Sequence, residues 1–584
     1  MCGIAGIISQ NREILTYQQL KKMTDAIEHR GPDGEGQWIN DNNGVGLGHR
    51  RLSIIDLTDA GSQPMHYLDR YSIVFNGEIY NYIEIREFLK TKGYTFVSDS
   101  DTEVLMANFD YKREKCLEDF DGMFAFALWD KKEQVLFCAR DRFGEKPFFY
   151  HQSHNNFYFG SEMKALWSVG VPRETNNRML FNYWHFGYIN NSNDLSETFY
   201  KNIFLLEPSH YMIVDPNGKI IKKQKYWDID YKNQLDKVDF NEVKDTFFRL
   251  FETSISRRLR SDVAVGTSLS GGLDSSSTVC MINHMKVNNV EQKTFSARFP
   301  NFIKDESVYI DKVLNSVNAK GISCFPTIES MVANVKEIIH HQEEPFGTLS
   351  IAAQYEVMKL ARDNDVIVLL DGQGADEYLC GYHGLIDSFF IELKKKNEKE
   401  YKRQLEIYKQ VHASNQINSI SRRLRMSFLK EKLSDAQIDK LLGIKSGIDN
   451  FTKKDAKKDL YSQYKNEQFK RKYSATSLNE MLYHATFRGG LQELLRYADR
   501  NSMAHSLEVR LPFLSHELVE FVFTLPSTCK VNNGFSKYIL REAMNDVVPK
   551  DIVWRKDKIG YEPPNKNEVN GVPLKSYLID AFKI

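Results

Sequence analysis

The second residue of the chain is a cysteine, and this position suits a nucleophile. The small side chain of Cys2 permits removal of Met1, which would leave a thiol and a free α-amine on one residue. An unperturbed α-amine titrates at roughly 7.7–8.0 and a thiol near about 8.5, so a modest local field would give a useful thiolate with the amine as its base. A Met-Cys start taken alone favours a cysteine that merely begins a β-strand.

A glycine-rich turn near the middle of the chain has the composition of an anion-binding loop. Residues 263–269 form an apolar run typical of a buried strand, and Ser270, Gly271 and Gly272 then form a turn that opens a helical stretch with Ser275. Backbone N–H groups in such a turn and the positive end of the helix dipole attract anions. The turn differs from the phosphate loop of many nucleoside triphosphatases, because no lysine follows its glycines.

The elements around these residues divide the chain into two parts. Up to about residue 227, short alternating or apolar runs separated by turn residues indicate layered β-sheets with a few helices. From Asp239 onward, apolar residues at helical spacing lead into the strand at 263–269, and a second buried strand is predicted at 366–370. This alternation of strand, loop and helix predicts a parallel sheet. We therefore predict an α/β fold class with domains at 1–230 and 231–584.

Composition excludes several classes of partner. Lys plus Arg equals Asp plus Glu at 78 each, so no global charge favours nucleic acid or an anionic membrane. The seven cysteines are scattered without metal-ligand spacing, which indicates reduced thiols. The start lacks a basic leader and no run is long enough to cross a bilayer, so we expect a cytoplasmic protein. The Lys-rich stretch at 394–472 is interpreted as surface helices, with polyanion binding as the alternative.

Six motifs in the first 150 residues resemble one family when they are taken in order. They are MCGIAGI (1–7), HRGPDG (29–34), RLSI (51–54), NGEIYN (76–81), SDTE (100–103) and DRFGEKP (141–147). This set resembles the class II glutamine amidotransferase domain, which has an N-terminal nucleophile fold of stacked antiparallel sheets. The resemblance covers about the first 200 residues and favours the nucleophile interpretation of the cysteine.

The resemblance implies a role for each motif residue. Cys2 would attack the side-chain amide of glutamine, while the Asn76 amide and the Gly77 N–H would form the oxyanion hole. Arg51 would bind the α-carboxylate, and two acidic residues would bind the α-ammonium group. Those acidic residues are Glu78 and Asp101. The neighbouring Arg50 is not assigned to the α-carboxylate, since the family ligand immediately precedes Leu-Ser-Ile. Three other motif residues, Arg30, Asp33 and Lys146, are interpreted as loop structure.

The glycine-rich turn resembles the loop of ATP pyrophosphatases, which cut ATP between the α- and β-phosphates and adenylate a substrate. This resemblance implies ATP-binding by the loop and the strand ends near it: Ser270, Gly271, Gly272, Asp274, Ser275, Ala297, Asp371 and Gly372. A cleaved pyrophosphate carries more charge than backbone dipoles neutralise, so Mg²⁺ is expected, held by Asp274 and Asp376. Both follow predicted strands, and parallel sheets bind ligands at the carboxyl ends of their strands.

Three segments further along the chain resemble the C-terminal half of asparagine synthetase B. The similar segments are LRYADRNSMAHS (495–506), EVRLPF (508–513) and GFSKY (534–538), in which Lys537 matches a lysine that stabilises charge during adenylation. Three charged residues of these segments are candidates for binding substrate or for a network of ion pairs: Asp499, Arg500 and Arg510. The alternative is that segment 495–506 is a helix whose residues mostly belong to the apolar core. The family has Glu at the position of Gln373, which is associated with forming the aspartyl adenylate.

These resemblances imply a glutamine-dependent asparagine synthetase that uses glutamine, aspartate and ATP, with ammonia passing through a dry passage between domains. The loss of charge at Gln373 leaves open another carboxylate acceptor, such as a sugar uronate, a peptide or a small metabolite. A non-catalytic scaffold is a third interpretation. The sequence is compatible with a homodimer but does not fix the oligomeric state.

Overall fold

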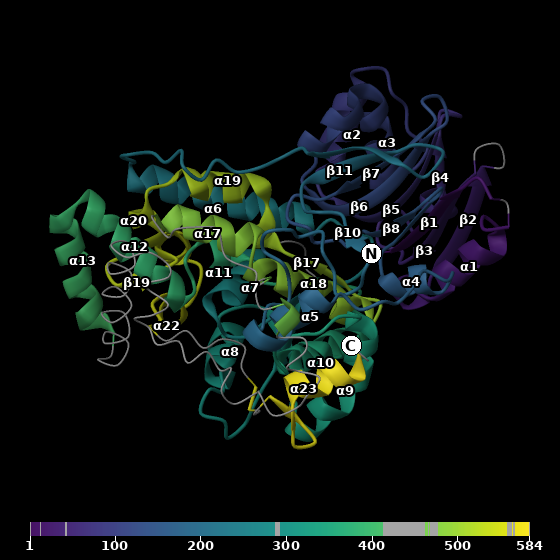
Figure 1. The fold of residues 1–584 in the computed structure, drawn as a ribbon. Helices are drawn as coiled ribbons and strands as arrows, with labels where there is room; N and C mark the ends of the chain where they lie inside the picture. The colour runs from purple at the N-terminus through teal and green to yellow at the C-terminus, as the bar shows by residue number, and fades with distance from the viewer. Residues whose placement is uncertain are drawn as a thin grey trace.

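The computed structural model describes residues 2–11, 13–40, 44–285, 292–412, 462–464, 467, 477–556, 563–564 and 567–582. Figure 1 shows two parts, an N-terminal part drawn in purple and blue and a larger part drawn in teal to yellow. The predicted boundary at residue 230 falls between β12 (Ile220–Lys225) and α6 (Phe240–Arg258) and stays a prediction. Of the Lys-rich stretch, α12 (His383–Lys396) and α13 (Glu398–Val411) are described, and residues 413–461 lie outside the described residues.

The N-terminal part consists of two six-stranded antiparallel sheets that face each other. Their strand orders are β10-β8-β9-β1-β3-β2 and β12-β11-β7-β6-β5-β4. The strands are β1 (Gly3–Ser9), β2 (Gly34–Asn40), β3 (Val45–Arg51), β4 (Met65–Tyr67), β5 (Tyr71–Ile79), β6 (Gly122–Asp130), β7 (Val135–Arg140), β8 (Phe149–Ser153), β9 (Asn156–Gly160), β10 (Phe204–Leu205) and β11 (His210–Val214), with β12. The predicted layered sheets are therefore confirmed.

Helices cover the outer faces of these sheets, so both faces of the central strands are apolar. On β1, Ile4 and Ile8 join the core between the sheets, whereas Ala5 and Ile7 join the core under α1. The strand period of two places these pairs on opposite faces. The helices of this part are α1 (Tyr17–Asp25), α2 (Tyr82–Lys90), α3 (Asp101–Lys112), α4 (Met163–Trp167) and α5 (Asn177–Phe186).

The second part is built on a five-stranded parallel sheet with the order β15-β14-β13-β16-β17. The strands are β13 (Val265–Ser268), β14 (Gln292–Ala297), β15 (Ala319–Cys324), β16 (Val368–Leu370) and β17 (Glu508–Arg510). After β13 the chain adds β14 and β15 on one side of the sheet, and after β16 it adds β17 on the other side. The loops that follow these two strands therefore meet at the topological switch point, where open parallel sheets bind ligands.

Helices and short hairpins surround this sheet, and the helix expected from Asp239 onward is α6. The other helices are α7 (Leu273–His284), α8 (Ser307–Leu314), α9 (Ile328–Gln342), α10 (Ser350–Arg362), α11 (Ala375–Tyr378), α17 (Leu478–Phe487), α18 (Gly490–Met503), α19 (His516–Thr524), α20 (Ser527–Lys530), α21 (Tyr538–Met544), α22 (Lys550–Val553) and α23 (Leu574–Ala581). Short strands β18 (Val531–Asn532), β19 (Phe535–Ser536), β20 (Glu568–Val569) and β21 (Val572–Pro573) form two hairpins.

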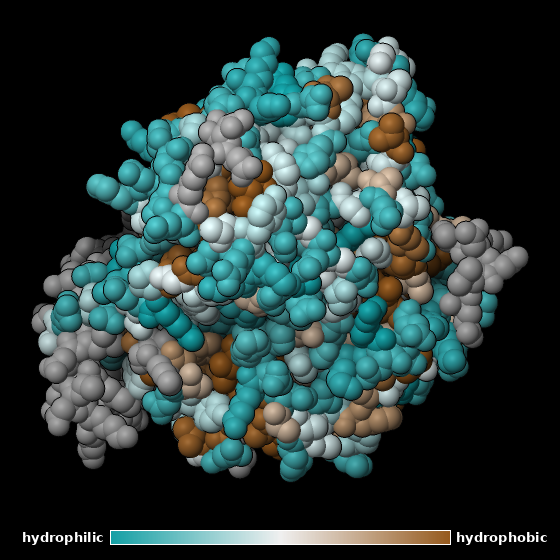
Figure 2. Space-filling view, turned by 90° about the vertical axis from the view of Figure 1, so that its right-hand side faces the viewer, coloured by the Kyte–Doolittle hydropathy of each residue, from teal (hydrophilic) through white to brown (hydrophobic). Residues whose placement is uncertain are grey.

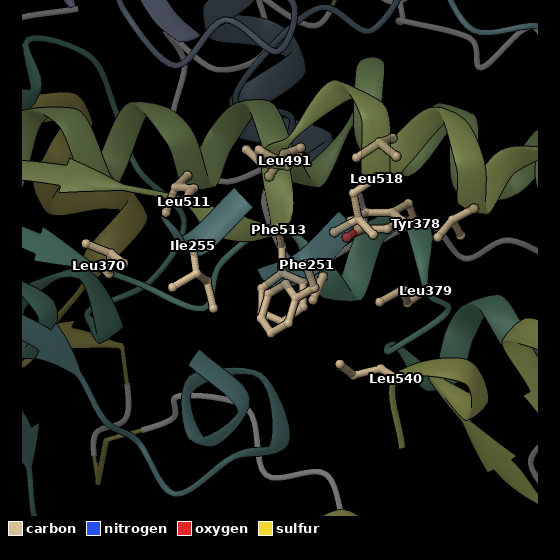
Figure 3. Packing of buried hydrophobic residues seen from close by; sticks show 14 of the residues in the cluster. Phe251, Ile255, Leu370, Tyr378, Leu379, Leu491, Leu511, Phe513, Leu518 and Leu540 are labelled. Atoms are coloured by element: carbon tan, nitrogen blue, oxygen red, sulfur yellow. The ribbon is translucent and has the colours of Figure 1, made fainter. Parts of the chain in front are cut away.

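The main apolar core of the second part extends into the first part. Phe251 of α6 stacks on Phe513 with ring centroids 4.5 Å apart, at the centre of the cluster shown in Figure 3. Burial of one such side chain contributes about 1.5–3 kcal/mol. Leu52 and Tyr80 of the N-terminal part belong to the same cluster. The two parts therefore share a packed interface rather than a flexible junction.

The face of the molecule shown in Figure 2 is predominantly hydrophilic. On the face shown in Figure 2, hydrophobic residues form small separate groups among polar ones. Within the described residues, no helix has the length and apolar character needed to cross a membrane.

Candidate active sites

The Cys2 thiol lies in a buried corner of the N-terminal part, just before β1. Its main-chain N–H donates to Asn76 Oδ1 over 3.1 Å, and its Sγ lies 3.9 Å from the Leu52 carbonyl oxygen. Burial raises the pKa of the Cys2 thiol, whereas the nearby positive charge of Arg51 lowers it. The net direction is upward, so the local field does not by itself produce the thiolate expected from the sequence.

Asn76 and Gly77 on β5 provide an unoccupied amide donor beside the thiol. Asn76 is fully buried, and its Nδ2 has no hydrogen-bond partner among the described residues. A buried amide donor without a partner costs free energy unless a ligand uses it. Gly77 has φ +154°, and a Cβ there would lie 2.1 Å from the Met123 carbonyl oxygen, so only glycine fits. This geometry suits an oxyanion hole.

Glu78 and Asp101 form a buried acidic pair at the end of β5. Asp101, the first residue of α3, accepts a 2.8 Å hydrogen bond from the Ile79 N–H. Burial raises the pKa of Asp101 to about 6, and burial together with Glu508 and Asp101 raises the pKa of Glu78 well above its usual range. Buried like charges are stabilised by a cation, so the pair suits an ammonium ligand.

The two neighbouring arginines on β3 point in different directions. Arg51 donates to the main-chain carbonyls of Asp56 and Thr58, the latter over 2.8 Å. Arg50 instead donates to the Thr24 carbonyl over 3.3 Å and lies 3.0 Å from Glu35. Strand alternation thus directs Arg50 toward α1, on the other face of the sheet, while Arg51 acts electrostatically on the Cys2 thiol.

The glycine-rich turn in the second part connects β13 to α7, and hydrogen bonds between its serine residues stabilise it. Ser275 Oγ lies 3.0 Å from Ser270 Oγ and accepts a 3.2 Å hydrogen bond from the Ser270 N–H. Gly271 has φ +79°, and a Cβ there would lie 2.9 Å from the Tyr309 Cβ. The turn therefore needs glycine and holds the beginning of α7 toward the switch point.

The loop after β16 touches this turn. A Cβ on Gly372 would lie 2.7 Å from the Ser275 N, so the two loops approach each other closely. The Asp371 N–H donates to the Arg510 carbonyl over 2.9 Å, and burial raises the pKa of the Asp371 carboxyl. Gln373 follows with its Oε1 buried and unpaired among the described residues. The structure thus brings the residues predicted from two distant segments to one point.

Lys537 lies between the two predicted metal ligands. Its Nζ contacts Asp274 and lies 2.5 Å from Asp376 Oδ1. A Cβ on Gly381 would lie 1.7 Å from Asp376 Oδ1 and 2.4 Å from Lys537 Cε, so the absence of a side chain there leaves room for this cluster. Two convergent carboxylates fit Mg²⁺ that is completed by phosphate oxygens. Within the described residues, no group of three or more Asp, Glu, His or Cys side chains is arranged to hold a metal ion.

The two loops and Lys537 line a cavity of about 380 Å³ at the switch point. Ala297 and Gln373 also line it, together with residues that the sequence analysis missed: Glu306, Gln354, Tyr382, Tyr497, Arg541 and Arg555. Arg555 donates to Glu306 over 2.6 Å, and burial lowers the pKa of Arg541 to about 10. Neither arginine lies in a recognisable motif, so no pattern in the sequence signalled them.

Charged side chains connect the two parts behind Cys2. Arg30 Nε donates to the Cys2 carbonyl over 3.2 Å, while its Nη atoms donate to Asp499 over 2.9 and 3.0 Å. Arg500 lies 2.9 Å from Glu162, which also binds Arg30. The interpretation of Arg30 as mere loop structure is therefore too narrow, and Asp499 and Arg500 belong to a buried network.

Two family models together match most of the chain. The glutamine amidotransferase domain matches residues 1–227, and asparagine synthase matches residues 246–583. Glutamine-hydrolysing asparagine synthetase 1 of Bacillus subtilis is 33% identical over 98% of this chain and 89% of its own length. Asparagine synthetase 3 of the same organism is 30% identical over 95% of this chain and 86% of its length.

A relative with a different name is also similar over most of its length. Amidase chry2 of Gibberella zeae is 27% identical over 97% of this chain and 89% of its length. All three span both matched regions. The chain therefore belongs to the asparagine synthase family and is an ATP-dependent amidotransferase ligase with a glutamine amidotransferase domain.

Proposed function

We propose that this protein is a glutamine-dependent asparagine synthetase, which converts aspartate, glutamine and ATP to asparagine, glutamate, AMP and pyrophosphate. The observation that carries the proposal is the Asn76 Nδ2 beside Cys2, which has no partner among the described residues, in the same chain as a cavity at the switch point that is suited to anions. The first site fits amide hydrolysis and the second fits adenylation. The names of the first two relatives support aspartate as the acceptor.

In the first site, Cys2 Sγ attacks the glutamine side-chain carbonyl, and the Asn76 Nδ2 and Gly77 N–H stabilise the oxyanion. Arg51 binds the α-carboxylate, and Glu78 and Asp101 bind the α-ammonium group. Ammonia leaves as the thioester forms. Water then releases glutamate and regenerates the thiol.

In the second site, the turn with Ser270, Gly272 and Ser275 binds the phosphates that become pyrophosphate. Asp274 and Asp376 would hold Mg²⁺, which would supply charge neutralisation for the departing pyrophosphate. Lys537 stabilises negative charge as the acceptor carboxylate attacks the α-phosphorus. Ammonia then attacks the acyl carbon, and AMP departs.

Ammonia has to cross the interface between the parts without being protonated. A cavity of about 70 Å³ lies there, lined by residues of both parts that include Phe149, Ile189 and Leu495 but also Glu145 and Arg500. Helix α18 contributes residues both to this cavity and to the nucleotide cavity. The mixed lining is less apolar than the dry passage that we predicted, and this cavity is our candidate for part of the route.

A replacement of Cys2 by Ala tests the two-site scheme. We expect loss of glutamine-dependent AMP formation with retention of AMP formation from free ammonium. Glutaminase activity is measured in parallel as glutamate release. Loss of ammonium-dependent activity in a folded Cys2→Ala variant would contradict the scheme.

The second candidate acceptor is another small carboxylate. Gln373 presents a buried Oε1, unpaired within the described part of the chain, rather than a negative charge, and one relative is named an amidase. A neutral side chain cannot pair ionically with the α-ammonium of aspartate. AMP formation across a panel of carboxylates separates the candidates, because the proposal requires aspartate to be preferred. A Gln373→Glu variant then reports whether charge at this position changes the KM for aspartate.

A further inference from the structure

Glu78, the proposed ligand of the glutamine α-ammonium group, contacts a side chain from the other part of the protein. Arg510 Nη2 lies 3.6 Å from Glu78 Oε1. Arg510 is fully buried and is the last residue of β17, an outer strand of the parallel sheet. The amidotransferase site therefore receives a positive charge from the part that holds the nucleotide cavity.

The remainder of the Arg510 side chain is fixed by other partners. Its Nε donates to Glu508 over 2.6 Å, and its Nη1 donates to the carbonyl oxygens of Arg258 and Arg260 over 2.8 and 2.6 Å. Nη2 makes no hydrogen bond within the described residues, and neither does Glu78 Oε2. The guanidinium is therefore held in one orientation, with Nη2 as the group left for Glu78.

Two further buried carboxylates lie near this pair. Glu78, Asp101 and Glu508 are buried carboxylates, and the negative charge of Glu508 raises the pKa values of both Glu78 and Asp101. Burial has the largest effect on the pKa of Glu78 and raises it, Glu508 and Asp101 raise it further, and Arg510 lowers it. Because only an ionised carboxylate attracts an ammonium group strongly, removal of Arg510 would weaken that attraction.

We propose that Arg510 is a positioning residue for glutamine recognition, which supplies from the synthetase part the positive charge that lets Glu78 bind the α-ammonium group as a carboxylate. This inference rests on the proposed role of Glu78. The main-chain carbonyl of Arg510 accepts the Asp371 N–H, so one residue contacts both the glutamine site and the first loop residue after β16.

The test compares glutamine with glutaramate, which is glutamine without its α-amino group. The readout is the ratio of kcat/KM for glutamine to kcat/KM for glutaramate, measured as ammonia release by the full-length protein. In Arg510→Met we expect this ratio to fall about tenfold or more, mainly through the KM for glutamine, since loss of the neighbouring positive charge raises the pKa of Glu78 further. The kcat/KM for glutaramate should remain within about threefold, because that substrate has no ammonium group.

A second comparison covers the case in which Arg510→Met does not fold, because that change removes a hydrogen-bond donor from the buried Glu508 carboxylate. The double variant Arg510→Met with Glu508→Gln removes both charges, a change that buried ion pairs often tolerate. The ratio of kcat/KM for glutamine to kcat/KM for glutaramate should be at least about threefold lower in the double variant than in Glu508→Gln alone. Equal ratios in both comparisons would overturn the proposal.

Arg258 provides a matched control. It is also buried, also comes from the synthetase part, and its guanidinium also lies over the Tyr80 ring, but it pairs with Asp121 over 3.3 Å. Arg258→Met should change kcat/KM for both substrates by the same factor, and an equal fall in the ratio would overturn a specific role of Arg510. A wild-type ratio near one would refute the ligand role of Glu78 itself, and with it this inference.

Discussion

Replacement of Gly381 by Ala should inactivate the synthetase site without affecting the glutaminase site. A Cβ at this position would lie 1.7 Å from Asp376 Oδ1 and 2.4 Å from Lys537 Cε. Ordinary carbon–oxygen contacts need more than 3 Å, so the two side chains must move by about 1 Å or more. Displacements of this size in a catalytic group reduce rates about 10²-fold.

The assay measures pyrophosphate release with saturating ammonium, so that glutamine hydrolysis does not limit the rate. We expect kcat for pyrophosphate release to fall about 10²-fold and glutaminase kcat to stay within about twofold. Overpacking should also lower the free energy of unfolding by about 1–3 kcal/mol, measured by urea denaturation. Because the clash is local, the loss of rate should exceed what the loss of stability explains.

Gly384, the second residue of α12, provides a matched control. A Cβ there would meet nothing within 4 Å. Gly384→Ala should therefore leave both activities unchanged and raise helix stability slightly, by up to about 1 kcal/mol. A folded Gly381→Ala protein with pyrophosphate release within about threefold of wild type would refute our reasoning on this cluster.

Three further predictions concern the first site and the interface. Asn76→Ala should lower glutaminase kcat about 10²–10³-fold while ammonium-dependent AMP formation stays unchanged, and equal losses in both assays would contradict an oxyanion role. Burial raises the pKa of Glu145 to about 8, so its charged form destabilises the fold, and stability is lost as pH rises from about 4.5 through 8. Glu145→Gln should therefore raise Tm at pH 8 but not at pH 4.5. The same shift in Tm at both pH values would exclude ionisation of Glu145 as the cause. Arg30→Met should lower the free energy of unfolding by about 3–5 kcal/mol in urea, because it removes the guanidinium that pairs with the buried Asp499 and one of the cations around Glu162. A change below about 1 kcal/mol would show that the network is well solvated.

Much of the fold was predictable because its signals are local. The apolar runs of the first part became β1, β3 and β5, and the helical spacing after Asp239 became α6. The period of side chains along a strand or a helix is fixed by backbone geometry, so it can be read without tertiary information. The parallel sheet followed from the alternation of elements, while its strand order required the structure.

The site residues were predictable only where they lie in motifs. Arg541 and Arg555 line the nucleotide cavity but occur in segments without a distinctive pattern. The pKa of the Cys2 thiol also differs from the expected direction, because burial around residue 2 is produced by distant strands. Desolvation depends on the whole packed environment, and no local spacing reports it.

The sequence by itself determined which chemical groups this protein has and in what order: an early cysteine, an amide and acidic motif at 76–78, and a glycine-rich turn after a strand. Only the tertiary structure decided which of these groups meet. Lys537 lies between Asp274 and Asp376, Arg30 reaches Asp499, and Arg510 reaches Glu78. Residues separated by hundreds of positions are brought together by sheet order and core packing, which depend on long-range contacts and leave no periodic signal along the chain.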